Sequence, residues 1–409
     1  MFTMKRRYVF STTVLALGWA AALVLHGCSS EEAATATKLV ITISGEQTGR
    51  EGYAFPPAGG EALAFVDGWS LTFDHLVVSI GEVTLSESPD LAPTDQSKRG
   101  AVVARAKGPW VVDLAKAGAN VGAPIAVSSL HTTGAEFATP SVGRGSGEDA
   151  AVRLVAFENL NVAGKAFDPA VRYALGYSTV PVSATAIAVN VVDAETTALV
   201  SEMQGAGAVI AYVGRATWKG ASCTSSDPAY DWSSFPKTVA FKLLFKTPVD
   251  FINCQNSDLE GKPFDGEERQ RGVQVRAGAL NFQQLTFHND HAFWLTADHE
   301  AAAPFFDSIA AAAKSDGTVT LADLEAVDPT GFKDRAGHAL PWRSCIASVG
   351  IPAGQRRVDT NGFGASFDRT KGPKEALRNY AEAMAYVTAV QGHLNDDGLC
   401  AVQRNYDSP

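Results

Sequence analysis

The chain has 409 residues, of which 46% are hydrophobic and 19% are charged, and its formal net charge is −10. This composition is that of a globular protein and excludes a disordered chain. The acidic balance argues against a nucleic-acid partner, because such a surface repels phosphate backbones. The length is sufficient for two or three domains with a large buried core.

The first 28 residues have the layout of a secretory signal. A charged start, KRR, precedes an apolar run from Val14 to Leu25, which is shorter than the roughly 20 residues that a membrane-spanning helix needs. The segment ends in LHGC, which resembles a bacterial lipobox, so we expect cleavage before Cys28 and lipidation of that cysteine. Ser29 follows it, which resembles the sorting rule for the outer membrane. We therefore expect an envelope protein that is held to the membrane by lipid.

Four cysteines follow the signal segment: Cys223, Cys254, Cys345 and Cys400. An even number of cysteines in an oxidising compartment predicts two disulfides. We favour the pairs that are near in sequence, Cys223–Cys254 and Cys345–Cys400. A zinc site made of all four thiolates is the alternative, although no two of these cysteines form a CxxC motif.

The rest of the chain predicts a mainly β fold, with a β-sandwich-like body and an α-helical C-terminal part. Short β-branched runs separated by glycine, proline and asparagine turns recur from Lys38 to about residue 287. We expect the following organisation: signal peptide 1–27, flexible tether 28–37, β-sandwich domain 38–192, second β-rich part 193–300, and helical part 301–409.

Several helix boundaries can be predicted from capping residues. Asp193 is the expected N-cap of a helix that ends at the glycines of QGAGA. Thr320 and Asp323 form a capping-box pattern at the start of LADLEAV. We expect helices to begin at Pro304 and at Pro373, the latter being the longest.

Two segments carry a resemblance to known proteins. LTFDHLVVSIGEVTL and the later GPWVVDL resemble a secreted β-sandwich module of unknown function that occurs in bacterial lipoproteins, over about residues 63 to 116. The chain after the signal segment also resembles uncharacterised lipoproteins of environmental bacteria. This resemblance implies an envelope location and brings no known activity.

One stretch is dense in metal-ligand side chains. FHNDHAFWLTADHE contains His288, His291 and His299 and directly follows a predicted strand. Neutral imidazole is a ligand that zinc and copper favour, so these histidines are candidate ligands of a copper or zinc site. The interpretation that we favour from the sequence is a polar loop whose histidines bond to backbone groups. Three alanines follow Glu300, which excludes the HExxH motif of metalloproteases.

No catalytic motif accompanies this cluster. The chain has no G-x-S-x-G elbow and no P-loop. We interpret Asp74-His75 as a break in a strand where a polar pair faces solvent, and half of an acid–base pair is the alternative. The leading hypothesis is a non-catalytic envelope lipoprotein that binds a protein or glycan or has a structural role. The copper or zinc protein is the second hypothesis, and a hydrolase with a scattered site is the third.

Overall fold

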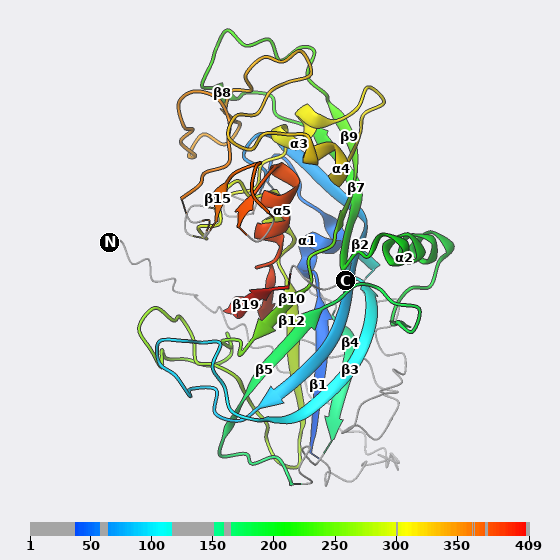
Figure 1. Ribbon diagram of the computed structural model, residues 1–409, viewed down its shortest axis with the longest axis vertical. Helices are drawn as coiled ribbons and strands as arrows, with labels where there is room; N and C mark the ends of the chain where they lie inside the picture. Colours follow the sequence, from blue (N-terminus) through cyan, green and yellow to red (C-terminus); the bar gives the residue numbers. More distant parts are fainter. Residues whose placement is uncertain are drawn as a thin grey trace, which may run out of the picture. The chain divides into compact units, whose positions relative to one another are not determined.

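A computed structural model describes residues 37–57, 64–116, 151–158, 165–299, 302–361, 363, 365–372 and 375–405. The signal peptide, Cys28 and all but the last residue of the tether lie outside the described residues. The described residues belong to one compact unit. Its secondary structure is mainly β (Figure 1), which confirms the predicted fold class at that level.

The first sheet has the strand order β18-β17-β12-β1-β4. These strands span, in that order, Gly398–Leu399, Gly392–Leu394, Leu280–Phe287, Lys38–Ser44 and Val152–Glu158. β1 runs parallel to β12 and antiparallel to β4. The sheet therefore combines strands from the predicted segments 38–192, 193–300 and 301–409. Main-chain hydrogen bonds join these three segments.

The second sheet has the order β13-β9-β7-β2-β5-β10-β19, with β3, β6 and β11 paired beside it. Its strands span, in chain order, Trp69–Ser86 (β2), Val102–Asp113 (β3), Arg172–Thr179 (β5), Ile187–Ala188 (β6), Ile210–Trp218 (β7), Thr238–Phe245 (β9), Val249–Ile252 (β10), Val273–Gln274 (β11), Thr318–Thr320 (β13) and Ala401–Arg404 (β19). Two short pairs lie apart from it: β8 (Thr224–Ser225) with β14 (Arg343–Ser344), and β15 (Ser366–Phe367) with β16 (Ala376–Leu377).

Both sheets contribute to one hydrophobic core. Apolar side chains of β1 and β12 belong to the same buried cluster as those of β2, β5, β7 and β9. Phe293, which is fully buried, lies at its centre and contacts the rings of Phe65, Tyr212 and Phe241 in edge-to-face arrangements. Aromatic pairs of this geometry add stability beyond their buried area. This packing holds the segment around Phe293 rigidly between the sheets.

A smaller core lies on the other face of the second sheet. Helix α2 (Ala194–Ala206) buries Leu199 and Met203 there against Val77 and Val111, and Figure 1 shows the helix at the side of β2. The side chain of Asp193 accepts a hydrogen bond from the backbone N–H of Thr196 at 2.7 Å. Gly207 ends the helix in the left-handed conformation. Both predicted boundaries of this helix are confirmed.

The region after residue 301 is less helical than predicted. It contains α3 (Asp307–Ala312), α4 (Leu321–Glu325) and α5 (Tyr380–Thr388), which alternate with strands β13 to β19. The capping box is confirmed, because Asp323 accepts a hydrogen bond from the backbone of Thr320. The predicted start at Pro373 lies outside the described residues, whereas α5 itself begins after Asn379, whose side chain accepts from Glu382 N. Helix α5 is shorter than α2, so the prediction that it is the longest helix is wrong. Within the described ranges, no helix is long and apolar enough to cross a membrane.

The four cysteines form two disulfides, as predicted, but in a different pairing. Cys223 is bonded to Cys345 and Cys254 to Cys400, with sequence separations of 122 and 146 residues. The expected sequence-near pairs are therefore wrong, and the disulfides leave no thiolates for a four-cysteine zinc site. The pairing follows the sheets: Cys254 and Cys400 flank the strands β10 and β19, which are hydrogen-bonded to each other.

Candidate metal centre

Two strands of the first sheet bring His288 and His393 together. The register of β12 and β17 places Thr286 opposite His393, and the backbone N–H of His288 donates to Gln391 O at 2.9 Å. His288 is two residues beyond Thr286 and therefore points to the same face of the sheet as His393. Such diagonal neighbours lie close enough for aromatic side chains to touch.

A glycine allows β17 to lie against the second sheet. A Cβ atom at Gly392 would come within 2.4 Å of Tyr177 Oη and 2.6 Å of the Phe251 ring. Tyr177 then donates a hydrogen bond to the carbonyl of His393 at 3.2 Å. The backbone that carries His393 is therefore fixed by both sheets.

A 3-10 helix, η2 (Asn289–Phe293), carries the third histidine, His291. The Asn289 side chain fastens it to α1 (Glu46–Glu51) by donating to Gly45 O at 3.0 Å and Thr48 Oγ1 at 3.1 Å. The hydroxyl of Tyr53 donates to Asn289 Oδ1 at 2.6 Å. These contacts turn the chain after β12 so that His291 faces the other two rings.

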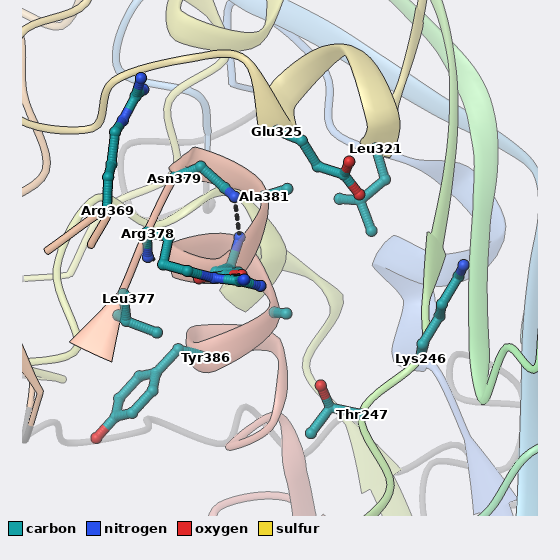
Figure 2. A pocket seen from close by; sticks show the side chains of 12 residues that line it. Lys246, Thr247, Leu321, Glu325, Arg369, Leu377, Arg378, Asn379, Ala381 and Tyr386 are labelled. Carbon is teal, nitrogen blue, oxygen red and sulfur yellow. Dashed lines mark hydrogen bonds and ion pairs between the residues drawn. The ribbon is translucent and has the colours of Figure 1, made fainter. Parts of the chain in front are cut away.

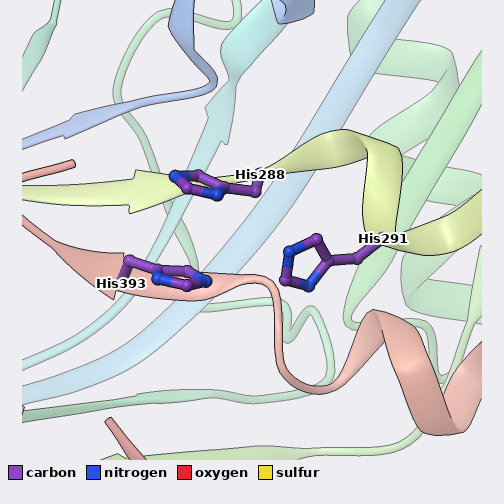
Figure 3. Close-up of side chains that lie close together, drawn as sticks. All are labelled: His288, His291 and His393. Carbon is purple, nitrogen blue, oxygen red and sulfur yellow. The ribbon is translucent and has the colours of Figure 1, made fainter. Parts of the chain in front are cut away.

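Figure 3 shows the resulting cluster of His288, His291 and His393. Each ring offers one nitrogen, and these three nitrogens lie within 4.8 Å of one another. The rings of His288 and His393 are stacked, with centroids 4.2 Å apart and planes 8° apart. The His291 ring stands nearly perpendicular to both, at 5.7 Å and 5.5 Å. The three nitrogens are therefore near enough to one another to be candidate ligands of one ion.

Two of these histidines are buried and have unpaired nitrogens. His291 is 1% exposed and His393 is 2% exposed. Among the described residues, Nδ1 of His291 and both ring nitrogens of His393 have no hydrogen-bond partner. Leaving a buried polar atom unpaired costs about 1–3 kcal/mol, so each such atom needs an explanation.

The surroundings of His291 hold its ring in place. Trp294 lies against it with ring centroids 3.7 Å apart, and its indole N–H donates to Asp290 Oδ2 at 2.9 Å. The exposed His299 closes the other side, with its ring 5.0 Å from that of His291 and 6.2 Å from that of His393. His299 is therefore a neighbour of the cluster, while His393 supplies the third nitrogen.

Burial keeps the inner histidines neutral. It lowers the pKa of His291 well below the usual histidine value, and nearby positive charge on His393, His288 and His299 would lower it further. Burial likewise lowers the pKa of His393, and positive charge on His288 and His299 would lower it further. Backbone groups of Asp397 and Val390 act in the opposite direction and raise this pKa. Neutral imidazole is the form that binds a metal.

Carboxylates lie beside the three rings. Glu46 Oε1 is 3.3 Å from His288 Nε2, and Glu46, His288 and Asp396 offer ligand atoms within 4.8 Å of one another. Burial raises the pKa of the Asp290 carboxyl, while the charges of His288 and His299 lower it. The cluster is thus bordered by negative charge that would offset the charge of a bound cation.

Two of the three predicted histidines belong to the cluster in the structure. His288 and His291 come together as expected, but His393 replaces His299 in the three-nitrogen group. His393 was missed because it lies in a short strand more than 100 residues away in sequence. Only the pairing of β12 with β17 reveals its position.

No protein family, curated protein or solved structure matches this chain. The function must therefore be argued from the geometry of the described residues.

His75 lies elsewhere and differs from the prediction. It is buried, and its Nδ1 lies 2.8 Å from Asp113 Oδ2 and 3.3 Å from Thr196 Oγ1. β2 continues through Asp74-His75 with a bulge, which turns the histidine inward. Because threonine and aspartate contact the same ring nitrogen, this group does not have the relay geometry of a catalytic triad.

The pocket drawn in Figure 2 also lacks a recognisable catalytic arrangement. Its volume is about 610 Å³, and it lies between α4, α5 and the end of β9. Arg378 and Glu382 form an ion pair within it, and the described residues that line it include Glu325 but no serine, histidine or cysteine.

The neutral histidines predict a loss of stability in mild acid. A histidine whose pKa is lowered by folding binds fewer protons when folded than when unfolded, so the free energy of unfolding falls as the pH drops below about 6.5. His291 and His393 should each contribute a slope of up to about 1.4 kcal/mol per pH unit in the metal-free protein. Urea unfolding between about pH 7 and pH 5 measures this slope.

His393→Gln should remove about half of that slope. His338→Gln, which changes a histidine with a 73% exposed side chain, is the control for the substitution itself. Equal slopes in the wild type and the His393→Gln variant would contradict the assignment of a buried neutral His393.

Proposed function

We propose that this protein binds a copper or zinc ion through His288, His291 and His393. The observation that carries the proposal is the convergence of three imidazole nitrogens, with unpaired nitrogens on both buried rings. An ion at this point would satisfy polar atoms that otherwise destabilise the fold. Three histidines leave a fourth position open to water or another ligand.

Ion binding needs one small movement. A metal lies near the plane of each imidazole that binds it, so two parallel rings cannot both bind the same ion as they stand. The ring of His393 makes no hydrogen bond within the described residues and is therefore the one that turns about its Cβ–Cγ bond. Its backbone remains held by β12 and Tyr177.

Metal analysis of protein purified from the periplasm tests the proposal. We expect about one ion or more per chain in the wild type, and an affinity loss of about 100-fold or more in His393→Ala and His291→Ala, because each removes a ligand. His338→Ala is the matched control with an exposed histidine. Trace metal in the wild type, or unchanged affinity in both variants, would refute the proposal.

We also propose that the chain is a lipid-anchored envelope protein of the outer membrane, with a sandwich-like body formed by its two sheets. The lipobox-like LHGC sequence supports the anchor, and the disulfides suit an oxidising compartment. Palmitate labelling of the wild type, lost in Cys28→Ala, is the expected result; labelling that ignores this change would contradict the anchor.

A further inference from the structure

A second set of ligand atoms lies beside the three histidines. Glu46 begins α1 directly after β1, His288 follows β12, and Asp396 lies in the turn between β17 and β18. Because β17, β12 and β1 are neighbours in the sheet, their ends bring these three side chains together. The backbone N–H of Asp396 donates to Thr286 Oγ1 at 3.0 Å, which fixes the turn beside β12.

The contact between His288 and Glu46 has the geometry of two ligands of one ion. Nε2 of His288 is buried and lies 3.3 Å from Glu46 Oε1, yet it makes no hydrogen bond. In a tetrahedral zinc site with ligand distances of about 2.0–2.1 Å, neighbouring ligand atoms are about 3.3–3.4 Å apart.

His288 is able to serve two ions because its two nitrogens lie on different edges of the ring. Nε2 faces Glu46, which leaves Nδ1 for the ion shared with His291 and His393. Binding of both ions would replace the remaining ring N–H of His288 and release that proton to solvent, so that each nitrogen of the ring would hold one ion.

We propose that the cluster holds two metal ions, the second in a subsite made of Glu46, Asp396 and Nε2 of His288. This inference rests on the proposed function, because His288 belongs to both subsites. One nitrogen and two carboxylate oxygens suit zinc, and the two carboxylates balance the charge of a divalent cation. Glu46 is 27% exposed and Asp396 is exposed, so an ion reaches this subsite from solvent.

Zinc titration of the exported full-length protein, followed by elemental analysis after removal of free zinc, tests the number of subsites. We expect two equivalents in the wild type and one in Glu46→Gln/Asp396→Asn, the remaining ion being held by His288, His291 and His393. Asparagine tolerates the positive φ of 81° at position 396, so the turn is preserved. Glu51→Gln on the same helix and Asp397→Asn in the same turn are matched controls that should keep two equivalents.

Copper provides a second readout that does not depend on affinity. With two equivalents of Cu²⁺, the electron paramagnetic resonance spectrum of the wild type should show magnetic coupling between the ions. That coupling should be absent in the double variant. Thermal melting of each metal-free variant, within about 3 °C of the wild type, shows that the fold is retained.

The outcomes separate this inference from the proposed function. A single equivalent in the wild type, with Glu46→Gln merely weakening it, overturns the second subsite; Glu46 then positions His288 as an outer partner of one ion. Two equivalents in the double variant overturn it as well. No bound zinc in the wild type overturns both the subsite and the three-histidine site.

Discussion

Replacing Asp307 by alanine should destabilise the protein by about 3–5 kcal/mol, because it breaks a buried ionic network. Asp307 accepts hydrogen bonds from Arg343 Nε at 2.8 Å and Nη2 at 2.6 Å, and from Trp69 Nε1 at 2.8 Å. Arg356 donates from Nη2 to Asp307 Oδ2 at 3.2 Å and from Nη1 to Asp67 Oδ2 at 2.8 Å. All these charged side chains are buried, with at most 3% of each exposed.

The cost arises from the arginines that remain. A guanidinium stays charged in proteins, so Arg343 would remain buried without the carboxylate that it pairs with, and Arg356 would keep only its pair with Asp67. Arg343 lies over the ring of Trp232 at 4.0 Å and cannot swing out without losing that contact. The network thus joins the loop before β2, α3 and the segment around β14.

Chemical denaturation of Asp307→Ala measures the loss. Glu202→Ala is a suitable control, because Glu202 pairs with Lys242 at 2.8 Å on the surface, where both side chains are more than 40% exposed. That control should change the free energy of unfolding by less than about 1 kcal/mol. A loss below about 1 kcal/mol in Asp307→Ala would show that the network does not stabilise the fold as described.

Removing the Cys254–Cys400 disulfide should cost about 2–5 kcal/mol. The bond closes a separation of 146 residues, and the chain-entropy model assigns loops of about this length nearly 5 kcal/mol at 25 °C. It lies at the junction of β10 and β19, where Ile252 is paired with Ala401. Its loss therefore frees the edge strand β19.

We expect Cys254→Ala/Cys400→Ala to melt at a lower temperature and to exchange the β19 amide hydrogens faster. The chain between α5 and β19 carries β17, so zinc affinity should fall as well, because His393 loses one of its anchors. Cys223→Ala/Cys345→Ala is the comparison: it should destabilise the protein without increasing exchange selectively in β19. Equal melting temperatures of the reduced and oxidised wild type would contradict this role.

Local features of the fold could be predicted from the sequence alone. The N-cap Asp193, the glycine end of α2 and the Thr320–Asp323 capping box were found because a cap requires only residues that are near in the chain. The start of α5 was placed wrongly at Pro373. The capping residue Asn379, with Glu382 three residues later, is the signal that could have located it.

The pairings between distant segments could not be predicted in this way. The loop closed by Cys223 and Cys345 is about four times as long as the predicted one, but this difference costs only about 1.2 kcal/mol of chain entropy. Such a bias is small beside the packing of two sheets. Loop entropy therefore favours the sequence-near cysteine pairs only weakly, and the packing of the sheets determines which cysteines meet.

By itself, the sequence determined the mainly β character, the helix caps and the presence of His288 and His291 in one turn, because each depends on residues within a few positions of one another. Only the tertiary structure decided that His393, Glu46 and Asp396 join them. That choice depends on β17 and β1 flanking β12 in a defined register, and register is set by long-range packing of both sheets.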